Sequence, residues 1–114
     1  VIESLLEGQT IVDDPNRNEI QPEKFKLGSN YPNPFNPATR FEYSVAEQDF
    51  VNIAVYNIVG RKIKQLVNQI KPAGSYSQEW DGTDIHGQEV TSGVYFYKMM
   101  VGGEQQKKKM MLLR

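Results

Sequence analysis

The feature that most constrains this chain is a succession of short runs in which every second residue is apolar. Phe41, Tyr43 and Val45 alternate in this way, and so do Tyr95 and Tyr97. Residues that alternate lie on one face of a β-strand. Glycine, asparagine and aspartate stand between the runs, and residues 102–103 (Gly-Gly) form a two-residue hairpin signal. The chain is therefore expected to be all-β, with no long helix.

The runs are spaced by roughly 8–12 residues, which is typical of antiparallel sandwiches. We therefore predict an immunoglobulin-like antiparallel β-sandwich of about seven strands. Trp80 and the tyrosines of 93–101 supply the large core side chains, because the chain has no cysteine for a core disulfide. The predicted strands cover residues 39–45, 51–57, 61–67, 74–81, 88–90 around Val90, 93–101 and 104–114.

The run at 61–67 fits the alternation least well. Ile63 and Leu66 break the two-residue period by one position, which a β-bulge or a strand end explains. Residues 59–70 also contain apolar residues at helical spacing. We favour a strand, because the segment is short and strands surround it.

Length and composition exclude several classes of function. A chain of 114 residues corresponds to one domain. Its net charge of −1 disfavours a nucleic-acid binder. It lacks cysteine and has a single histidine, His86, so Cys-based zinc sites and multi-His metal sites within the chain are excluded. No run approaches the ~20 apolar residues of a transmembrane helix. We expect no cofactor and no transmembrane segment.

The first residues differ in character from the rest. Residues 1–24 are polar and contain Pro15 and Pro22, which is linker chemistry or the tail of an upstream domain. The chain starts at Val1, so we expect a piece of a longer protein whose final domain occupies residues 25–114.

Residues 30–39 (NYPNPFNPAT) are rich in proline and asparagine. Proline disfavours helical backbone angles in the residue before it, and an asparagine side chain can close an Asx turn. We expect Asn30, Asn33 and Asn36 to form such turns, while Tyr31 and Phe35 pack their rings onto the domain. A polyproline ligand for another protein is the alternative.

Candidate chemistry in the loops is sparse. Asp81, Asp84 and Glu89 form a carboxylate cluster, of which Asp81 and Asp84 are a weak calcium candidate. We favour turn capping for these two aspartates, and a turn role rather than catalysis for His86. Tyr56 and Phe50 make sugar binding a further alternative.

Charge is concentrated at the end of the chain. Residues 98–114 carry five basic groups and one acidic group, a balance of +4. Lysines on an edge strand prevent self-association, and an edge also offers backbone groups to a receptor strand. Both interpretations remain open at this point.

Four segments resemble the type A C-terminal sorting domain of type IX secretion cargo proteins: 30–39, 51–67, 73–99 (with Trp80-Asp-Gly and Ser92-Gly-Val-Tyr95) and 107–114. The middle segments are also similar to the immunoglobulin-like domain of the flagellar hook-capping protein. The resemblance covers about residues 22–114. It implies a non-catalytic signal that directs a larger cargo protein across the outer membrane, for release or surface attachment.

The resemblance also implies residues and partners. The partners are the type IX translocon, a sortase-like peptidase of the outer membrane, and an upstream catalytic or binding domain of the same chain, with no nucleic acid. The location is secreted or at the outer-membrane surface of a Bacteroidetes-like Gram-negative bacterium, reached through the periplasm. Cleavage is expected before Tyr31, within residues 1–29. A carbohydrate-binding module or spacer of a secreted hydrolase is the alternative. The implied recognition residues are Pro32, Asn33, Pro34, Phe35, Asn36, Pro37, Gly93, Val94, Tyr95, Lys107, Lys108, Lys109, Met110, Met111, Leu112 and Leu113.

Overall fold

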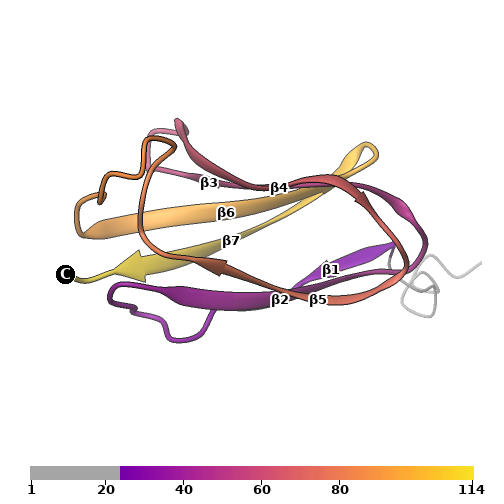
Figure 1. The fold of residues 1–114 in the computed structure, drawn as a ribbon, viewed down its shortest axis with the longest axis horizontal. Helices are drawn as coiled ribbons and strands as arrows, with labels where there is room; N and C mark the ends of the chain where they lie inside the picture. The colour runs from indigo at the N-terminus through magenta and orange to yellow at the C-terminus, as the bar shows by residue number, and fades with distance from the viewer. Residues whose placement is uncertain (1–23) are drawn as a thin grey trace, which may run out of the picture.

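The protein is a sandwich of two antiparallel sheets (Figure 1). The structure, a computed structural model, describes residues 24–114. One sheet has three strands in the order β1-β2-β5, and the other has four in the order β4-β3-β6-β7. The strands are β1 Phe25–Leu27, β2 Thr39–Val45, β3 Asp49–Tyr56, β4 Lys62–Lys71, β5 Gly74–Trp80, β6 Gly93–Val101 and β7 Glu104–Leu112. The prediction of an all-β, immunoglobulin-like sandwich of about seven strands is confirmed.

One predicted strand is replaced by another. The run around Val90 forms no strand: Glu89 makes an isolated bridge with Thr83, and the Val90 N–H donates to the Gly82 carbonyl (3.0 Å). The seventh strand is instead β1, at residues that carried no strand prediction. The segment predicted as a linker, residues 1–24, lies outside the described residues, apart from Lys24.

The core lies between the sheets and follows the predicted alternation. Phe41, Tyr43 and Val45 of β2 are buried, and Tyr97 and Met99 of β6 lie opposite them in the other sheet. The rings of Phe41 and Tyr97 stack with centroids 4.4 Å apart. Such pairs stabilise a core by about 0.5–1.5 kcal/mol beyond the area they bury.

The broken period of β4 is caused by bulges. Ile53 of β3 pairs with Val67, but the next residue, Ala54, pairs with Gln65, so Leu66 is extra. A second shift follows one pair later, between Val55 and Tyr56 of β3. The bulge explanation is confirmed, and the helical alternative for this segment is wrong.

Strand β1 is short but firmly attached. Phe25 and Leu27 are buried, and the strand pairs with β2. Gly28 follows so close to β2 that a Cβ at this position would lie 2.8 Å from the Glu42 carbonyl oxygen. Only glycine fits there, and its N–H donates to that same oxygen (2.7 Å).

The other edge of β1 is hydrogen-bonded to β7 by one side chain. The Gln106 amide accepts from the Leu27 N–H (2.9 Å) and donates to the Phe25 carbonyl (2.9 Å). The side chain thus satisfies the two backbone groups that a neighbouring strand would otherwise pair.

We expect Gln106→Ala to lower the free energy of unfolding by about 1–3 kcal/mol, because it leaves two partly buried backbone groups without their partners. Equilibrium urea unfolding measures this difference. Gln105→Ala is the matched control: the exposed Gln105 side chain precedes Gln106 on the same strand, and we expect a change within about 0.5 kcal/mol. Equal losses in both variants would contradict the role of Gln106.

Burial raises the pKa of the Tyr97 phenol to about 12. The hydroxyl donates to the Gly28 carbonyl (2.6 Å), so the folded state favours the protonated form. The pKa of this group is about 10 in the unfolded chain and about 12 in the folded protein. The protonated hydroxyl therefore contributes its full stabilisation below pH 10, and this contribution is lost as the pH rises towards 12.

We therefore expect the wild type to lose about 2–3 kcal/mol more of its free energy of unfolding between pH 9 and pH 12 than Tyr97→Phe does. Urea midpoints of the two proteins at both pH values provide the test. Lysines titrate in both proteins, so their effect on the free energy of unfolding cancels in this comparison. Parallel losses would show that Tyr97 does not carry the effect.

Candidate functional site

The proline-rich segment and the end of the chain lie side by side, although 78 residues separate Asn33 from Met111. The Met111 N–H donates to Asn33 Oδ1 (3.0 Å), and the Met111 carbonyl accepts from the Phe35 N–H (2.9 Å). The Leu113 N–H then donates to the Phe35 carbonyl (3.0 Å). We call this contact between residues 33–35 and 111–113 the terminal seam.

The geometry of the β6–β7 hairpin explains which residues of β7 reach the seam. Val101 pairs with Glu104 across the two-residue loop, so the even-numbered residues of β7 exchange their backbone hydrogen bonds with β6. The odd-numbered residues direct their backbone groups away from β6. Met111 and Leu113 therefore present theirs to the proline-rich segment.

The two aromatic rings of the proline-rich segment behave differently. Phe35 is 2% exposed, and its ring centroid lies 5.6 Å from that of Trp80. Tyr31 is 82% exposed, so the prediction that both rings pack onto the domain is correct for Phe35 and wrong for Tyr31. The Tyr31 backbone bridges to Arg40 in both directions, which fixes the residue while its ring stays outside.

Asn30 and Asn33 form hydrogen bonds other than the predicted Asx turns, while the turn expected at Asn36 stays a prediction. The Asn30 amide is buried and donates to the Pro32 carbonyl (3.2 Å) and to the Thr39 hydroxyl (3.0 Å). Asn33 takes part in the seam. The segment is a series of bends in which the peptide bonds before Pro32, Pro34 and Pro37 are cis.

The predicted recognition residues fall into two sets by burial. In the second half of β7 and just after it, Met110 and Leu112 are at most 1% exposed, whereas Met111 is 39% and Leu113 is 51% exposed. The buried set of predicted residues is Phe35, Tyr95, Met110 and Leu112. The exposed set is Pro32, Asn33, Pro34, Asn36, Pro37, Lys107, Lys109, Met111 and Leu113, while Gly93, Val94 and Lys108 are half-buried.

Tyr95 and Gly93 support the terminal strand from β6. Gly93 pairs with Leu112 and Tyr95 pairs with Met110. The Tyr95 ring meets Trp80 edge-on at 5.4 Å, and its hydroxyl donates to the Thr91 carbonyl (2.8 Å). Their position is structural: they hold β7 in its place.

The last residue fastens the seam to the β5–β6 loop. The Arg114 guanidinium donates to the carbonyls of Val90 (2.6 Å) and Gly82 (2.7 Å). Its Nη1 also lies 3.7 Å from a Glu89 carboxylate oxygen. Gly82 has a φ of 79°, and a Cβ there would lie 2.9 Å from the Pro37 carbonyl oxygen, so this position requires glycine.

Part of the β7 edge is open. The hairpin pattern directs the backbone groups of Lys107 and Lys109 outward, and no residue within 24–114 hydrogen-bonds to them there. The edge is therefore without a backbone partner among residues 24–114 at Lys107 and Lys109, whereas the seam occupies it at Met111 and Leu113.

The loop carboxylates organise turns, as we expected. Asp81 accepts hydrogen bonds from the Thr83 N–H (3.1 Å) and hydroxyl (2.6 Å), and the hydroxyl bond is the main reason why the pKa of Asp81 is lowered. Asp84 accepts from the backbone N–H groups of His86 and Gln88, and the latter bond is the main reason why its pKa is lowered. No group of three metal-ligating side chains occurs within the described part of the chain.

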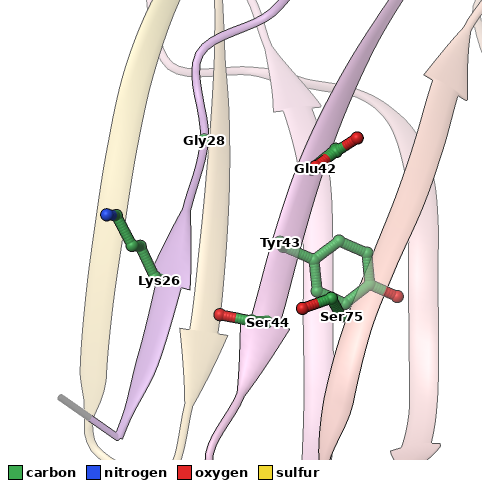
Figure 2. A pocket seen from close by; sticks show the side chains of 6 residues that line it. All are labelled: Lys26, Gly28, Glu42, Tyr43, Ser44 and Ser75. Carbon is green, nitrogen blue, oxygen red and sulfur yellow. The ribbon is translucent and has the colours of Figure 1, made fainter. Parts of the chain in front are cut away.

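A shallow hollow of about 240 Å³ lies on β1, β2 and β5 (Figure 2). Its lining contains Lys26, Gly28, Tyr43, Ser44 and Ser75, with Glu42 as its one carboxylate. The lining contains no histidine.

The sugar-binding alternative rests on the rings of Tyr56 and Phe50. Lys98 places its ammonium group 4.7 Å from the centroid of the Tyr56 ring and so covers one face of that ring. Phe50 is 47% exposed and stands at the other end of β3.

The expected cleavage region partly belongs to the fold. The region in which cleavage is expected, residues 1–29, contains Phe25 and Leu27, which are core residues. Among residues 24–114 there is also no helix long and apolar enough to cross a bilayer.

The family model described as "Secretion system C-terminal sorting domain" matches residues 29–113. No curated protein matches the chain in sequence. Solved structures with the same fold include the dimeric latent PorU of Porphyromonas gingivalis, with 22% identity and a TM-score of 0.65 over 91% of this chain and 10% of PorU.

Two further structures are similar. PorZ of P. gingivalis, described as an essential bacterial surface component of the type IX secretion system, has 17% identity and a TM-score of 0.55 over 77% of this chain and 11% of PorZ. FlgD of Xanthomonas campestris, which acts in flagellar hook capping, has 23% identity and a TM-score of 0.52 over 79% of this chain and 62% of FlgD. This chain thus spans about a tenth of PorU and of PorZ, and at these identities the likeness concerns the fold.

Proposed function

Because the chain belongs to the secretion system C-terminal sorting domain family, we propose that it is the non-catalytic export signal of a larger cargo protein. The cargo crosses the outer membrane through a type IX translocon and is then released or attached to the cell surface. The observation that carries this proposal is the terminal seam, which joins the proline-rich segment to the end of the chain within the region that the family model matches.

Burial decides which residues a translocon can contact. Phe35, Tyr95, Met110 and Leu112 are buried, so their role is to hold the end of the chain in place. The contact itself belongs to the exposed side chains around the seam. These are Pro32, Asn33, Pro34 and Asn36 on one side, and Lys107, Lys109, Met111 and Leu113 on the other.

This division changes how the signal is best tested. Removing residues 107–114 takes Met110 and Leu112 out of the core, so such a truncation destroys the fold and the signal together. A surface substitution separates the two effects.

We expect Leu113→Asp to block export of a cargo fusion and to leave the domain folded, because the side chain is 51% exposed. The assay measures the fraction of cargo on the surface of a bacterium with a type IX system. Ile70→Asp is the matched control: this residue is 62% exposed on β4, away from the seam.

Cargo retained in the periplasm for Leu113→Asp and displayed normally for Ile70→Asp supports the proposal. Normal display of both variants would contradict recognition at the seam. Urea unfolding of both purified variants shows whether each remains folded.

A further inference from the structure

A second hollow, of about 180 Å³, lies on the outer face of the four-stranded sheet. Its lining consists of Tyr56, Phe96, Lys98 and Lys107, together with Asn57, Ile58 and Gly60 of the β3–β4 turn. It is smaller than the ~300–1,000 Å³ of pockets for drug-sized ligands, so it suits a single small group.

Two lysines stand directly opposite each other at this hollow. Lys98 of β6 pairs with Lys107 of β7, and the pair belongs to the positions that share no backbone hydrogen bond, where side chains come closest. Like charges placed directly opposite each other destabilise a sheet. An anion bound between them removes this repulsion.

The ammonium groups are held in place by aromatic rings. Lys98 Nζ lies 4.7 Å from the centroid of Tyr56, and Lys107 Nζ lies 5.1 Å from that of Phe96. Lys109 pairs with Phe96, which lines the hollow.

The ion pairs within residues 24–114 involve other cations. Asp81 lies 3.9 Å from Lys64, and Glu89 lies 3.7 Å from Arg114. Within residues 24–114, no ion pair involves Lys98 or Lys107. The positive charge at the hollow is therefore available to a ligand.

An apolar tip projects beside the lysines. Ile58 and Val59 occupy the β3–β4 turn and are 74% and 79% exposed. Asn57 fixes this turn: its Oδ1 accepts from the Val59 and Arg61 N–H groups (3.1 and 2.9 Å). A rigid apolar tip next to lysines matches a bilayer surface, in which phosphate groups lie directly above the hydrocarbon.

We propose that this hollow binds the phosphate of an anionic lipid headgroup while Ile58 and Val59 enter the membrane interface. Lysine is a common phosphate ligand, since it contributes a compact point charge. The proposal does not depend on recognition by a translocon, although Lys107 lines the hollow and also belongs to the exposed residues proposed for that recognition.

Flotation of the chain with lipid vesicles tests this inference. We expect binding to vesicles that contain phosphatidylglycerol and none to pure phosphatidylcholine. The double variant Lys98→Gln/Lys107→Gln is expected to bind about 30-fold more weakly, since each lysine near an anionic surface contributes about fivefold. Ile58→Ser/Val59→Ser is expected to lose at least about tenfold.

Matched controls use the same residue types elsewhere. Lys71 lies 4.8 Å from the centroid of Tyr76, outside the hollow, so Lys71→Gln is expected to retain binding. Ile70→Ser controls for the loss of an exposed apolar side chain.

Three results would overturn the inference: no binding of the wild type to phosphatidylglycerol vesicles, equal losses in the control variants, or binding of inorganic phosphate without binding of vesicles. The assay contains no translocon. A failure here leaves the export proposal intact, and a failure of export leaves vesicle binding intact.

Discussion

Leu112→Asp is expected to unfold the domain, whereas Leu113→Asp, one position later, is expected to leave it folded. Leu112 is 0% exposed in the core and Leu113 is 51% exposed. Loss of a buried leucine costs about 2–5 kcal/mol, and the buried carboxyl group adds the cost of its desolvation. The sum approaches the entire stability of about 5–15 kcal/mol for a typical domain.

Equilibrium urea unfolding followed by tryptophan fluorescence measures both variants, since the single Trp80 lies in the same core. We expect Leu113→Asp to change the free energy of unfolding by less than about 1 kcal/mol. Similar losses for the two variants would contradict the burial pattern of the chain end.

Phe35→Ala is expected to lower the free energy of unfolding by about 3–5 kcal/mol. This is the second prediction with a large effect on stability. The ring is 2% exposed and lies against Trp80, so its removal leaves a cavity beneath the proline-rich segment. The backbone of the same residue holds Met111 and Leu113, and we therefore expect the terminal seam to loosen in this variant.

Tyr31→Ala is the control for Phe35→Ala, because it removes an aromatic ring from the same segment that is 82% exposed. We expect a change within about 0.5 kcal/mol. Thermal unfolding and hydrogen exchange at Met111 and Leu113 provide the readout. Equal destabilisation by Tyr31→Ala and Phe35→Ala would contradict the packing of Phe35 against Trp80. Unchanged hydrogen exchange at Met111 and Leu113 in Phe35→Ala would contradict its role in the terminal seam.

Local patterns were enough to predict most of the fold. Phe41, Tyr43 and Val45 alternate without interruption, and this period alone determines which face of β2 is buried. The irregular spacing of Ile63 and Leu66 likewise signals bulges, since a bulge shifts the period by one residue.

Features that depend on distant contacts were not predictable in this way. Strand β1 contains three residues, too few for a periodic signal, and it is held by Gln106 from the far end of the chain. The run around Val90 has strand-like composition, but it lies in a loop whose backbone is hydrogen-bonded to Gly82.

The candidate site was predictable from local patterns only in part. The sequence motifs identify its two halves, but the contact between Asn33 and Met111 depends on the fold of the whole chain. The difference between Tyr31 and Phe35 arises because a bent, proline-rich segment has no fixed period, so residue spacing does not determine which ring is buried.

Transfer of the signal to a new cargo tests the central proposal most directly. The entire chain is fused to the C-terminus of a periplasmic reporter, and surface display is measured in a bacterium with a type IX system and in a matched strain lacking it. We predict that the reporter reaches the cell surface in the first strain and remains periplasmic in the second. A folded fusion that stays in the periplasm of both strains, or reaches the surface of both, would contradict the proposal.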